Sequence, residues 1–186
     1  MTEAVDTRGR LLDTALGLYA EHGVEGTSLQ RIADALGVTK AAVYYYFKTK
    51  DEIAHAVIEP GLRDLRVAVT AAEAQRRHGA RVDTMLDGLV DVIIRHRTLV
   101  RLFNGDPGLQ RIVEASVREY GGVAERVIAV LTGAEPTPEA RVAAFVAVLG
   151  MSGTGGAPEV ADLDDDQLRA ALLDAGGRAL GRPRRR

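Results

Sequence analysis

Cationic, hydroxyl and phenol side chains are concentrated between residues 27 and 52 of this chain. All three lysines of the chain, Lys40, Lys48 and Lys50, lie in this segment, although arginine supplies the positive side-chain charge elsewhere. An ammonium group is a compact point charge suited to phosphate, and hydroxyl groups donate hydrogen bonds to the same oxygens. The residue types of this segment therefore indicate contact with the backbone of DNA.

Two short helices joined by a glycine turn are predicted to carry these side chains. The apolar residues of the first helix follow the i, i+3, i+4, i+7 spacing of one helix face, and they are Leu29, Ile32, Ala33 and Leu36. Thr27 or Ser28 can accept a hydrogen bond from the first amides of this helix, and Thr27 with Gln30 fits a capping box. Gly37 stands where a left-handed residue would end the helix.

The second helix is predicted to begin after Thr39 and to bury Val43 and Phe47. Its outward residues combine a cation, small side chains and phenols, and they are Lys40, Ala41, Ala42, Tyr45 and Tyr46, with Tyr44 at the boundary. A preceding helix is expected to stop at Gly23. Three helices with a tight central turn form a helix-turn-helix domain.

The run from Leu11 to Ile53 resembles the DNA-binding domain of the TetR family of bacterial transcriptional regulators. The matching features are a Leu-Leu-x-x-Ala opening, the Gly23 stop, Thr-Ser-x-x-x-Ile-Ala, and Leu-Gly-Val-Thr-x-x-x-Val-Tyr-Tyr-Tyr-Phe-Lys-Thr-Lys-Asp-Glu-Ile. Tyr46 departs from the pattern, because many members have His there, and a phenol does not titrate near neutral pH. The resemblance implies a ligand-responsive, dimeric, sequence-specific transcriptional regulator, more often a repressor than an activator.

The second helix of the motif is predicted to lie in the major groove of double-stranded DNA. Lys40 is expected to reach a guanine edge or an adjacent phosphate, while Ala41 and Ala42 touch thymine methyl groups or allow close approach. Gln30 and Arg31 are second-choice contacts with bases or backbone. The phosphate contacts are expected from hydroxyls, helix-start amides and one ammonium, supplied by Thr27, Ser28, Thr39, Tyr44, Tyr45, Tyr46 and Lys50.

Helical periodicity continues after residue 53, and the chain is predicted to be all-α. We expect a helix-turn-helix domain over residues 1–53, a helical effector-binding and dimerisation domain over 54–181, and a basic tail over 182–186. A fourth helix links the two domains and is expected to kink at Pro60, which cannot donate a backbone hydrogen bond.

The family resemblance implies a homodimer formed through the last two helices, which would require an inverted-repeat operator. The helix predicted over residues 139–151 is apolar nearly all round, so it must be buried on more than one side. The last helix carries a narrow stripe of small residues, and a flexible glycine-rich connector is predicted over 152–158. The candidate interface residues are Val142, Val146, Leu149, Leu168, Ala171, Leu172 and Ala175, the alternative being packing within one subunit.

The resemblance also implies a small-molecule effector, expected to be mainly apolar and to weaken operator binding by tilting the helix after Pro60. The candidate pocket residues are Leu62, Met85, Leu89, Ile93, Phe103, Tyr120 and Phe145, with His96 or Asn104 as a polar anchor. A cavity on the order of several hundred Å3 among Met85, Leu89, Phe103 and Phe145 would favour this regulator. Filled packing would favour the alternative, an architectural DNA-binding dimer or an activator without an effector.

Composition excludes several other classes of protein. The formal net charge of −2 argues against non-specific coating of nucleic acid, so the cations must act by their placement. Without cysteine the chain has no disulfide or thiol nucleophile, and its four histidines lack metal-ligand spacing, so neither a metal nor another cofactor is expected. No nucleophile, base and orienting group cluster, so we expect no enzyme. The lack of a signal peptide or a long apolar run predicts a soluble cytoplasmic protein.

Overall fold

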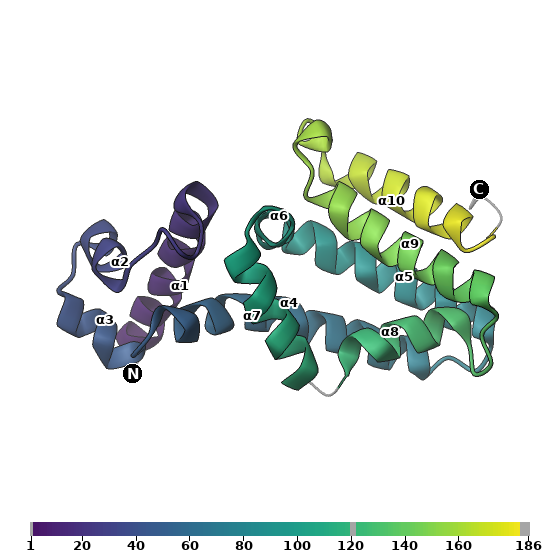
Figure 1. The fold of residues 1–186 in the computed structure, drawn as a ribbon, viewed down its shortest axis with the longest axis horizontal. Helices are drawn as coiled ribbons and strands as arrows, with labels where there is room; N and C mark the ends of the chain where they lie inside the picture. The colour runs from purple at the N-terminus through teal and green to yellow at the C-terminus, as the bar shows by residue number, and fades with distance from the viewer. Residues whose placement is uncertain (1, 120–121, 183–186) are drawn as a thin grey trace. The chain divides into compact units, whose positions relative to one another are not determined.

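A computed structural model of the chain describes residues 2–119 and 122–182, which fold into helices (Figure 1). The helices are α1 (Thr2–His22), α2 (Leu29–Leu36), α3 (Lys40–Tyr46), α4 (Lys50–Glu73), α5 (His78–Arg95), α6 (Arg97–Gly105), α7 (Pro107–Glu119), α8 (Val123–Thr132), α9 (Pro138–Gly155), the short 3-10 helix η1 (Pro158–Val160) and α10 (Asp165–Ala179). The all-α prediction is therefore confirmed. None of the described helices is both long enough and apolar enough to cross a membrane.

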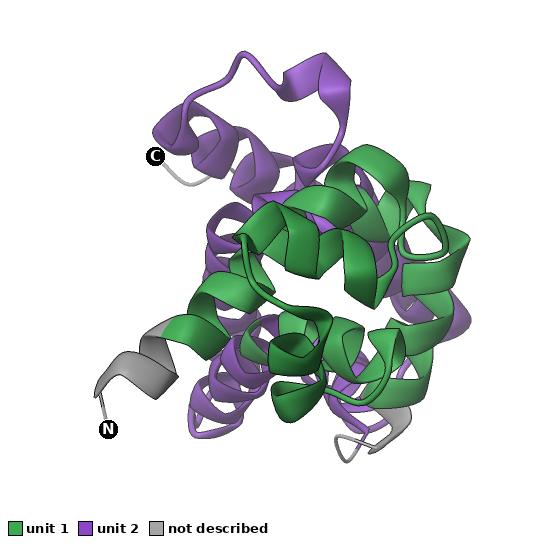
Figure 2. Ribbon diagram, turned by 90° about the vertical axis from the view of Figure 1, so that its left-hand side faces the viewer, with its two compact units in different colours: residues 1–60, 102–116 green, residues 61–101, 117–186 purple. Residues whose placement is uncertain are grey.

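The chain divides into two compact units (Figure 2). Unit 1 comprises residues 1–60 and 102–116, and unit 2 comprises residues 61–101 and 117–186. Residues 102–116, which the sequence-based boundary assigned to the second domain, thus pack in the first unit. Helix α4 runs through the boundary without ending at Pro60, so it contributes residues to both units.

Unit 1 is held together by apolar residues from α1 to α4. Tyr19 of α1, Ile32 of α2 and Val43 of α3 are almost completely buried. Phe47 is also buried, which confirms its predicted inward position, but it caps α3 in an extended conformation and does not belong to the helix. The short helices α2 and α3 are therefore fixed by tertiary packing, since helices of this length are unstable alone.

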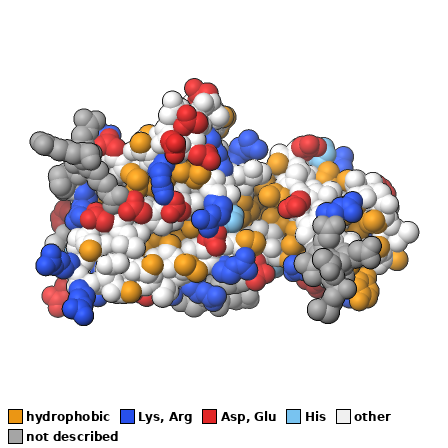
Figure 3. Space-filling view, turned by 180° about the vertical axis from the view of Figure 1, so that it is seen from behind, with side chains coloured by type: hydrophobic (Ala, Val, Ile, Leu, Met, Phe, Trp, Pro, Cys, Tyr) orange, Lys and Arg blue, Asp and Glu red, His pale blue; other side chains and the backbone are white. Residues whose placement is uncertain are grey.

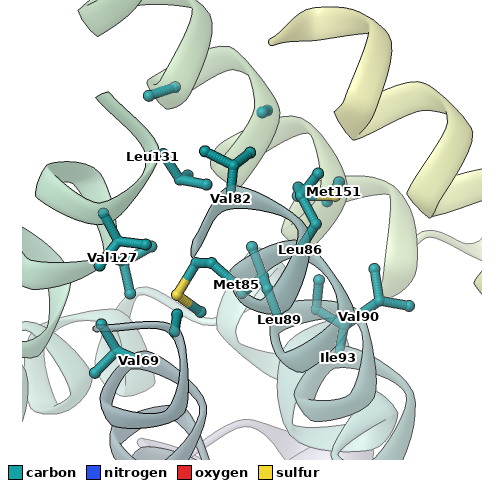
Figure 4. Packing of buried hydrophobic residues seen from close by; sticks show 14 of the residues in the cluster. Val69, Val82, Met85, Leu86, Leu89, Val90, Ile93, Val127, Leu131 and Met151 are labelled. Atoms are coloured by element: carbon teal, nitrogen blue, oxygen red, sulfur yellow. The ribbon is translucent and has the colours of Figure 1, made fainter. Parts of the chain in front are cut away.

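Unit 2 has its core between α5, α8, α9, α10 and the second half of α4. In Figure 4 Met85 points toward Val69 and Val127, while Leu86 points toward Met151. The start of the predicted basic tail is also fixed in this unit, because the Arg182 guanidinium donates to the carboxylate of Asp83 at 2.7 Å. Residues 183–186 lie outside the described residues.

The glycine-rich segment 152–158 is not the flexible connector that its composition predicted. Helix α9 continues through it to Gly155. A Cβ atom at Gly155 would lie 2.2 Å from the Ile93 side chain, and one at Gly156 would lie 2.7 Å from the backbone nitrogen of Arg101. These glycines therefore permit close packing of neighbouring helices, which composition alone does not distinguish from chain flexibility.

Candidate nucleic-acid interface

The turn between α2 and α3 has the geometry that the sequence predicted. Gly37 lies in the left-handed region, with φ 69° and ψ 31°, and its amide donates to the carbonyls of Ala33 and Asp34. Val38 donates to the Ala33 carbonyl at 3.0 Å, which completes the end of α2. A side chain at position 37 would be strained by about 1 kcal/mol or more, so the glycine fixes the direction in which α3 leaves the turn.

Helix α3 exposes a mixed face of cation, small side chains and phenols. Lys40 and Ala41 are exposed, and Tyr45 is 78% exposed. The ammonium group of Lys40 lies 5.5 Å from the centroid of the Tyr44 ring, a cation–π contact that leaves the charge accessible to solvent. This face could contact both base edges and phosphates.

The three tyrosines differ from their predicted order of exposure. Tyr44, expected at the boundary, is 40% exposed, whereas Tyr46 is half-buried and packs edge-on against Tyr45, with ring centroids 5.1 Å apart. Ala42 is likewise half-buried. Tyr44 and Tyr45 therefore present the more accessible phenols, while Tyr46 also supports the position of its neighbour.

Two hydroxyl groups cap the helices and remain able to bind phosphate. Ser28 Oγ accepts from the Arg31 amide at 3.1 Å, and Thr39 Oγ1 accepts from the Ala42 amide at 3.2 Å. Both residues are exposed. Because a hydroxyl accepts through its lone pairs and donates through its proton, each cap can donate to a phosphate oxygen at the same time.

The prediction that Thr27 contacts a DNA phosphate is corrected by the structure. Its side chain is 1% exposed, and its hydroxyl donates to the carbonyl of Gly23 at 2.8 Å. The predicted capping box of Thr27 with Gln30 is therefore absent, and Ser28, in an extended conformation, is the N-cap of α2. Either hydroxyl has suitable spacing in the sequence, and the tight turn after α1 decides between them.

The second-choice contacts, Gln30 and Arg31, are exposed but already hydrogen-bonded within unit 1. The Gln30 amide donates to the Asp34 carboxylate at 2.7 Å, and the Arg31 guanidinium donates to the Gly26 carbonyl at 3.2 Å. Because both contacts are exposed to water, which competes for the same groups, DNA could replace them at little cost.

Lys50 occupies a well-defined place at the start of α4. The Tyr19 hydroxyl donates to the Lys50 carbonyl at 3.2 Å, and Thr49 Oγ1 accepts from the Glu52 amide at 3.1 Å. The Lys50 ammonium is paired with the carboxylate of Glu25. The hydrogen bond from Lys50 lowers the pKa of Glu25, and the charges of Lys50 and Arg111 add to this effect.

Glu25 was not identified from the sequence. It lies 25 positions before Lys50, in the loop between α1 and α2, and no periodic pattern links the two residues. An acidic residue just outside a basic motif is a weak signal, and only the packing of unit 1 shows which lysine it pairs with.

Comparison with known proteins shows which family this chain resembles. The model of the family described as "Bacterial regulatory proteins, tetR family" matches residues 11–57. TtgW, an HTH-type transcriptional regulator of Pseudomonas putida, is 33% identical over 121 residues, which cover 62% of this chain and 90% of TtgW. The chain belongs to the TetR family.

Other TetR-family relatives match over different extents. The probable acrEF/envCD operon repressor of Escherichia coli is 42% identical over 65 residues, so the match spans only 34% of this chain and 30% of that repressor. The crystal structure of a TetR/AcrR-family transcriptional regulator from Thermobifida fusca matches with a TM-score of 0.56 at 27% identity, covering 97% of this chain and 100% of the other. Sequence similarity to the repressor is thus limited to about a third of each chain, while the helical architecture extends over nearly the whole chain.

A second surface of this TetR-family chain is apolar and lies on α9. Val142, Phe145, Val146 and Leu149 are between 48% and 64% exposed and recur at helical spacing along one side. A groove of about 440 Å3 lies between α9 and α10, which also lie side by side in Figure 1, and Ala171 and Ala175 line it. An exposed apolar stripe of this kind is typical of a protein–protein contact.

The prediction that Leu168 and Leu172 face a dimer partner is corrected by the structure. They are 1% and 3% exposed and belong to the core of unit 2. The predicted stripe on α10 is not a single outward face, because its leucines point into the core of unit 2 and only its alanines remain outside that core. Packing within one subunit, the alternative considered for these helices, accounts for the burial of the two leucines, and both also border the α9–α10 groove.

The predicted effector residues do not form one group. Met85, Leu89 and Ile93 are at most 5% exposed and pack in the core of unit 2, whereas Phe145 is 48% exposed on the outer side of α9. Phe145 is therefore wrong as a partner of those three residues. It lines instead a surface groove of about 510 Å3 between α8 and the start of α9.

The remaining candidates for the effector site have other surroundings. Leu62 is buried, and Nε2 of His96 lies 2.9 Å from the Asp64 carboxylate, which gives the proposed polar anchor an internal partner. Phe103 and Asn104 belong to α6 within unit 1. Tyr120 lies outside the described residues.

Charge is mixed on one face of the molecule. On the face drawn in Figure 3, basic and acidic side chains are interspersed over the described residues, with no continuous basic area. This distribution agrees with the low net charge of the chain, and it means that DNA contact depends on where individual cations lie.

Proposed function

We propose that this chain is a dimeric, sequence-specific regulator of transcription that binds double-stranded DNA through α3. The observation that carries the proposal is the exposed face of α3, where Lys40, Ala41 and Tyr45 are all open to solvent and the Lys40 ammonium lies over the Tyr44 ring. The capping hydroxyls of Ser28 and Thr39 flank the same motif. Membership of the TetR family supports the same role.

Base reading is assigned to the first turn of α3, lying in the major groove. Lys40 donates to a guanine edge or a neighbouring phosphate, while the small side chains of Ala41 and Ala42 allow close approach to thymine methyl groups. Ser28, Thr39, Tyr44, Tyr45 and Tyr46 position the helix by donating to phosphates, and Lys50 adds one charge. Thr27 has no part in this revised set because its hydroxyl is buried and already donates.

Dimerisation is assigned to the α9 stripe and the α9–α10 groove. Four exposed apolar side chains on one helix face would be unfavourable in water, and the same patch on a second copy can cover them by two-fold symmetry. A two-fold dimer presents two identical α3 helices, so the operator is an inverted repeat.

The response to an effector is assigned to unit 2, with repression relieved by a small, mainly apolar molecule. Support comes from α4, which begins beside the helix-turn-helix and continues into unit 2 through Pro60. Because proline removes one helical hydrogen bond, α4 has a point at which it can bend. Tilting α4 after Pro60 would change the spacing of the two reading helices.

A second candidate function is an architectural DNA-binding dimer without an effector. The specific observation in its favour is the packing of Met85, Leu89 and Ile93, which are buried against other core side chains. An effector that used these residues would have to displace part of the core, whereas an architectural protein would keep it filled.

Selection of fragmented genomic DNA with the purified protein tests the main proposal. We expect enrichment of fragments that share an inverted repeat, and that site then serves as the probe for effectors. A library of apolar compounds, screened by thermal shift and by release of the enriched site, separates the two candidates. No enrichment would contradict sequence-specific binding, and enrichment without any releasing compound would favour the architectural role.

A further inference from the structure

Glu25 holds two cations that come from distant parts of the chain. Its Oε2 atom is paired with the Lys50 ammonium at the start of α4, and its Oε1 atom accepts from the Arg111 guanidinium of α7 at 2.9 Å. All three residues belong to unit 1 (Figure 2). The one carboxylate is therefore shared between the lysine assigned to phosphate and an arginine from another helix.

We propose that Glu25 competes with the DNA backbone for Lys50, and that Arg111 sets how tightly Glu25 holds that lysine. The proposal rests on the assigned phosphate contact of Lys50. In free protein the lysine charge is used internally, so binding DNA exchanges a carboxylate for a phosphate. Arg111 then keeps the released Glu25 neutralised, which reduces its repulsion of the DNA.

Exposure of the three groups permits this exchange. The side chains of Lys50, Glu25 and Arg111 are 33%, 66% and 71% exposed, so no buried charge is created when the partners change. Exposed ion pairs are weak in water, and a phosphate on DNA is a comparable acceptor. The Glu25–Lys50 pair is therefore strong enough to lower DNA affinity and weak enough to be displaced.

Helix α7 is positioned on this pair by a separate contact. Asp106 caps α7 by accepting from the Leu109 amide at 2.9 Å, and its other oxygen accepts from the Val24 amide at 2.7 Å. A Cβ atom at Gly23 would lie 2.7 Å from the same carboxylate, so glycine is required for this approach. The start of α7 is thus fixed to the residue that precedes Glu25.

A regulatory consequence follows from this arrangement. Any event that withdraws α7 removes Arg111 from Glu25 and leaves the carboxylate to Lys50 alone. DNA affinity would then fall without movement of α3. Lys50 is in this way the point at which α7 influences phosphate binding.

The test is a titration of a short labelled DNA duplex of mixed sequence at several salt concentrations. Glu25→Gln should raise the affinity of the dimer roughly fivefold and steepen the dependence on log salt by about one unit per subunit. Arg111→Gln should lower affinity in the natural background and have less than about a twofold effect once Glu25→Gln is present. Glu21→Gln, an equal charge change on the last turn of α1, is the matched control and should have little effect.

A double-mutant cycle that combines Glu25→Gln with Lys50→Gln distinguishes this proposal from a general effect of net charge on DNA affinity. Lys50→Gln alone should weaken binding, which tests the phosphate contact itself. In the Lys50→Gln background, Glu25→Gln should no longer increase affinity, because its effect acts through that lysine. Any of three results would overturn the proposal. The first is that Glu25→Gln raises DNA affinity equally with and without Lys50→Gln, and the second is that it does not raise affinity at all. The third is that Arg111→Gln lowers affinity as much in the Glu25→Gln background as in the natural protein. Thermal unfolding of each variant shows that a change in affinity is not a change in folding.

Discussion

Among individual residues, Lys40 at the start of α3 is the cation to which the proposed function assigns base reading. Lys40→Ala should weaken binding to the selected operator by about 1–3 kcal/mol and relax the preference at one base pair in each half-site. Within the protein the Lys40 ammonium lies over the Tyr44 ring, and such an exposed cation–π pair is weak, so the unfolding temperature should hardly change. Fluorescence anisotropy with the operator and its single-base variants measures both effects. Unchanged affinity and preference would remove Lys40 from base reading.

A second prediction for a single residue concerns Asp64 and acid stability. The hydrogen bond from His96, followed by that from Arg95, lowers the pKa of the Asp64 carboxyl below its ordinary value. A group with a lowered folded-state pKa stabilises the fold above the unfolded pKa, and this contribution disappears as the pH falls through the folded pKa. Asp64→Asn should therefore reduce the unfolding free energy at neutral pH, and the difference from natural protein should shrink below about pH 4.

Urea unfolding of both proteins across this pH range measures the difference. Asp162→Asn, at an exposed aspartate, serves as the control and should show little loss of stability at any pH. A destabilisation by Asp64→Asn that is equally large in acid would mean that the side-chain shape, and not its charge, stabilises unit 2.

Among the helices, the glycines of α9 provide the clearest prediction. Gly155→Ala places a Cβ atom against Ile93 in the core and should destabilise the protein by about 1–3 kcal/mol. Gly153→Ala is the matched control, because no heavy atom outside its own helix lies within 4 Å of the added carbon. It should be neutral or slightly stabilising. Chemical denaturation compares the two, and equal stability would show that α9 and α5 can separate at this point.

The sequence predicted helices well where a capping residue and the spacing of apolar residues indicated the same helix boundary. Gly37 and Thr39 define the central turn by their own chemistry, so the helix-turn-helix could be derived from the sequence. The continuation of α9 to Gly155 could not, because glycine favours loops by composition and helices only when a neighbour such as Ile93 approaches closely. The inward turn of Leu168 and Leu172 likewise depends on which helices pack together.

The candidate DNA interface was predictable in its outline but not in its internal bonds. The hydroxyls of Thr27 and Ser28 are equivalent in a sequence, yet the fold buries one and exposes the other. The partners of Glu25 are equally hidden, since Lys50 and Arg111 lie 25 and 86 positions from it in the sequence and meet it only in the folded chain. Long-range pairs of exposed charges leave no periodic signal.

For the molecule as a whole, the α9 stripe should control assembly and operator binding together. Val146→Glu should shift the protein to a monomer in sedimentation and weaken binding to the full inverted repeat by more than about tenfold. Val67→Glu is the matched control, because Val67 is 63% exposed on α4 and lies outside the stripe. It should leave the dimer intact. A Val146→Glu monomer that binds the full site tightly would contradict the dimeric mode.

Cleavage by a tethered iron chelate would show where α3 lies on DNA. Because the chain has no cysteine, Tyr45→Cys creates a single attachment point for a chelate that cuts nearby DNA. Tyr45 is assigned to phosphate alone, so its replacement leaves the base contacts in place. We expect two clusters of cuts in the bound operator, related by the symmetry of the inverted repeat, and none from a chelate at Glu159→Cys. Bound complexes that remain uncut by the Tyr45→Cys protein, or are cut equally by both, would contradict DNA binding through α3.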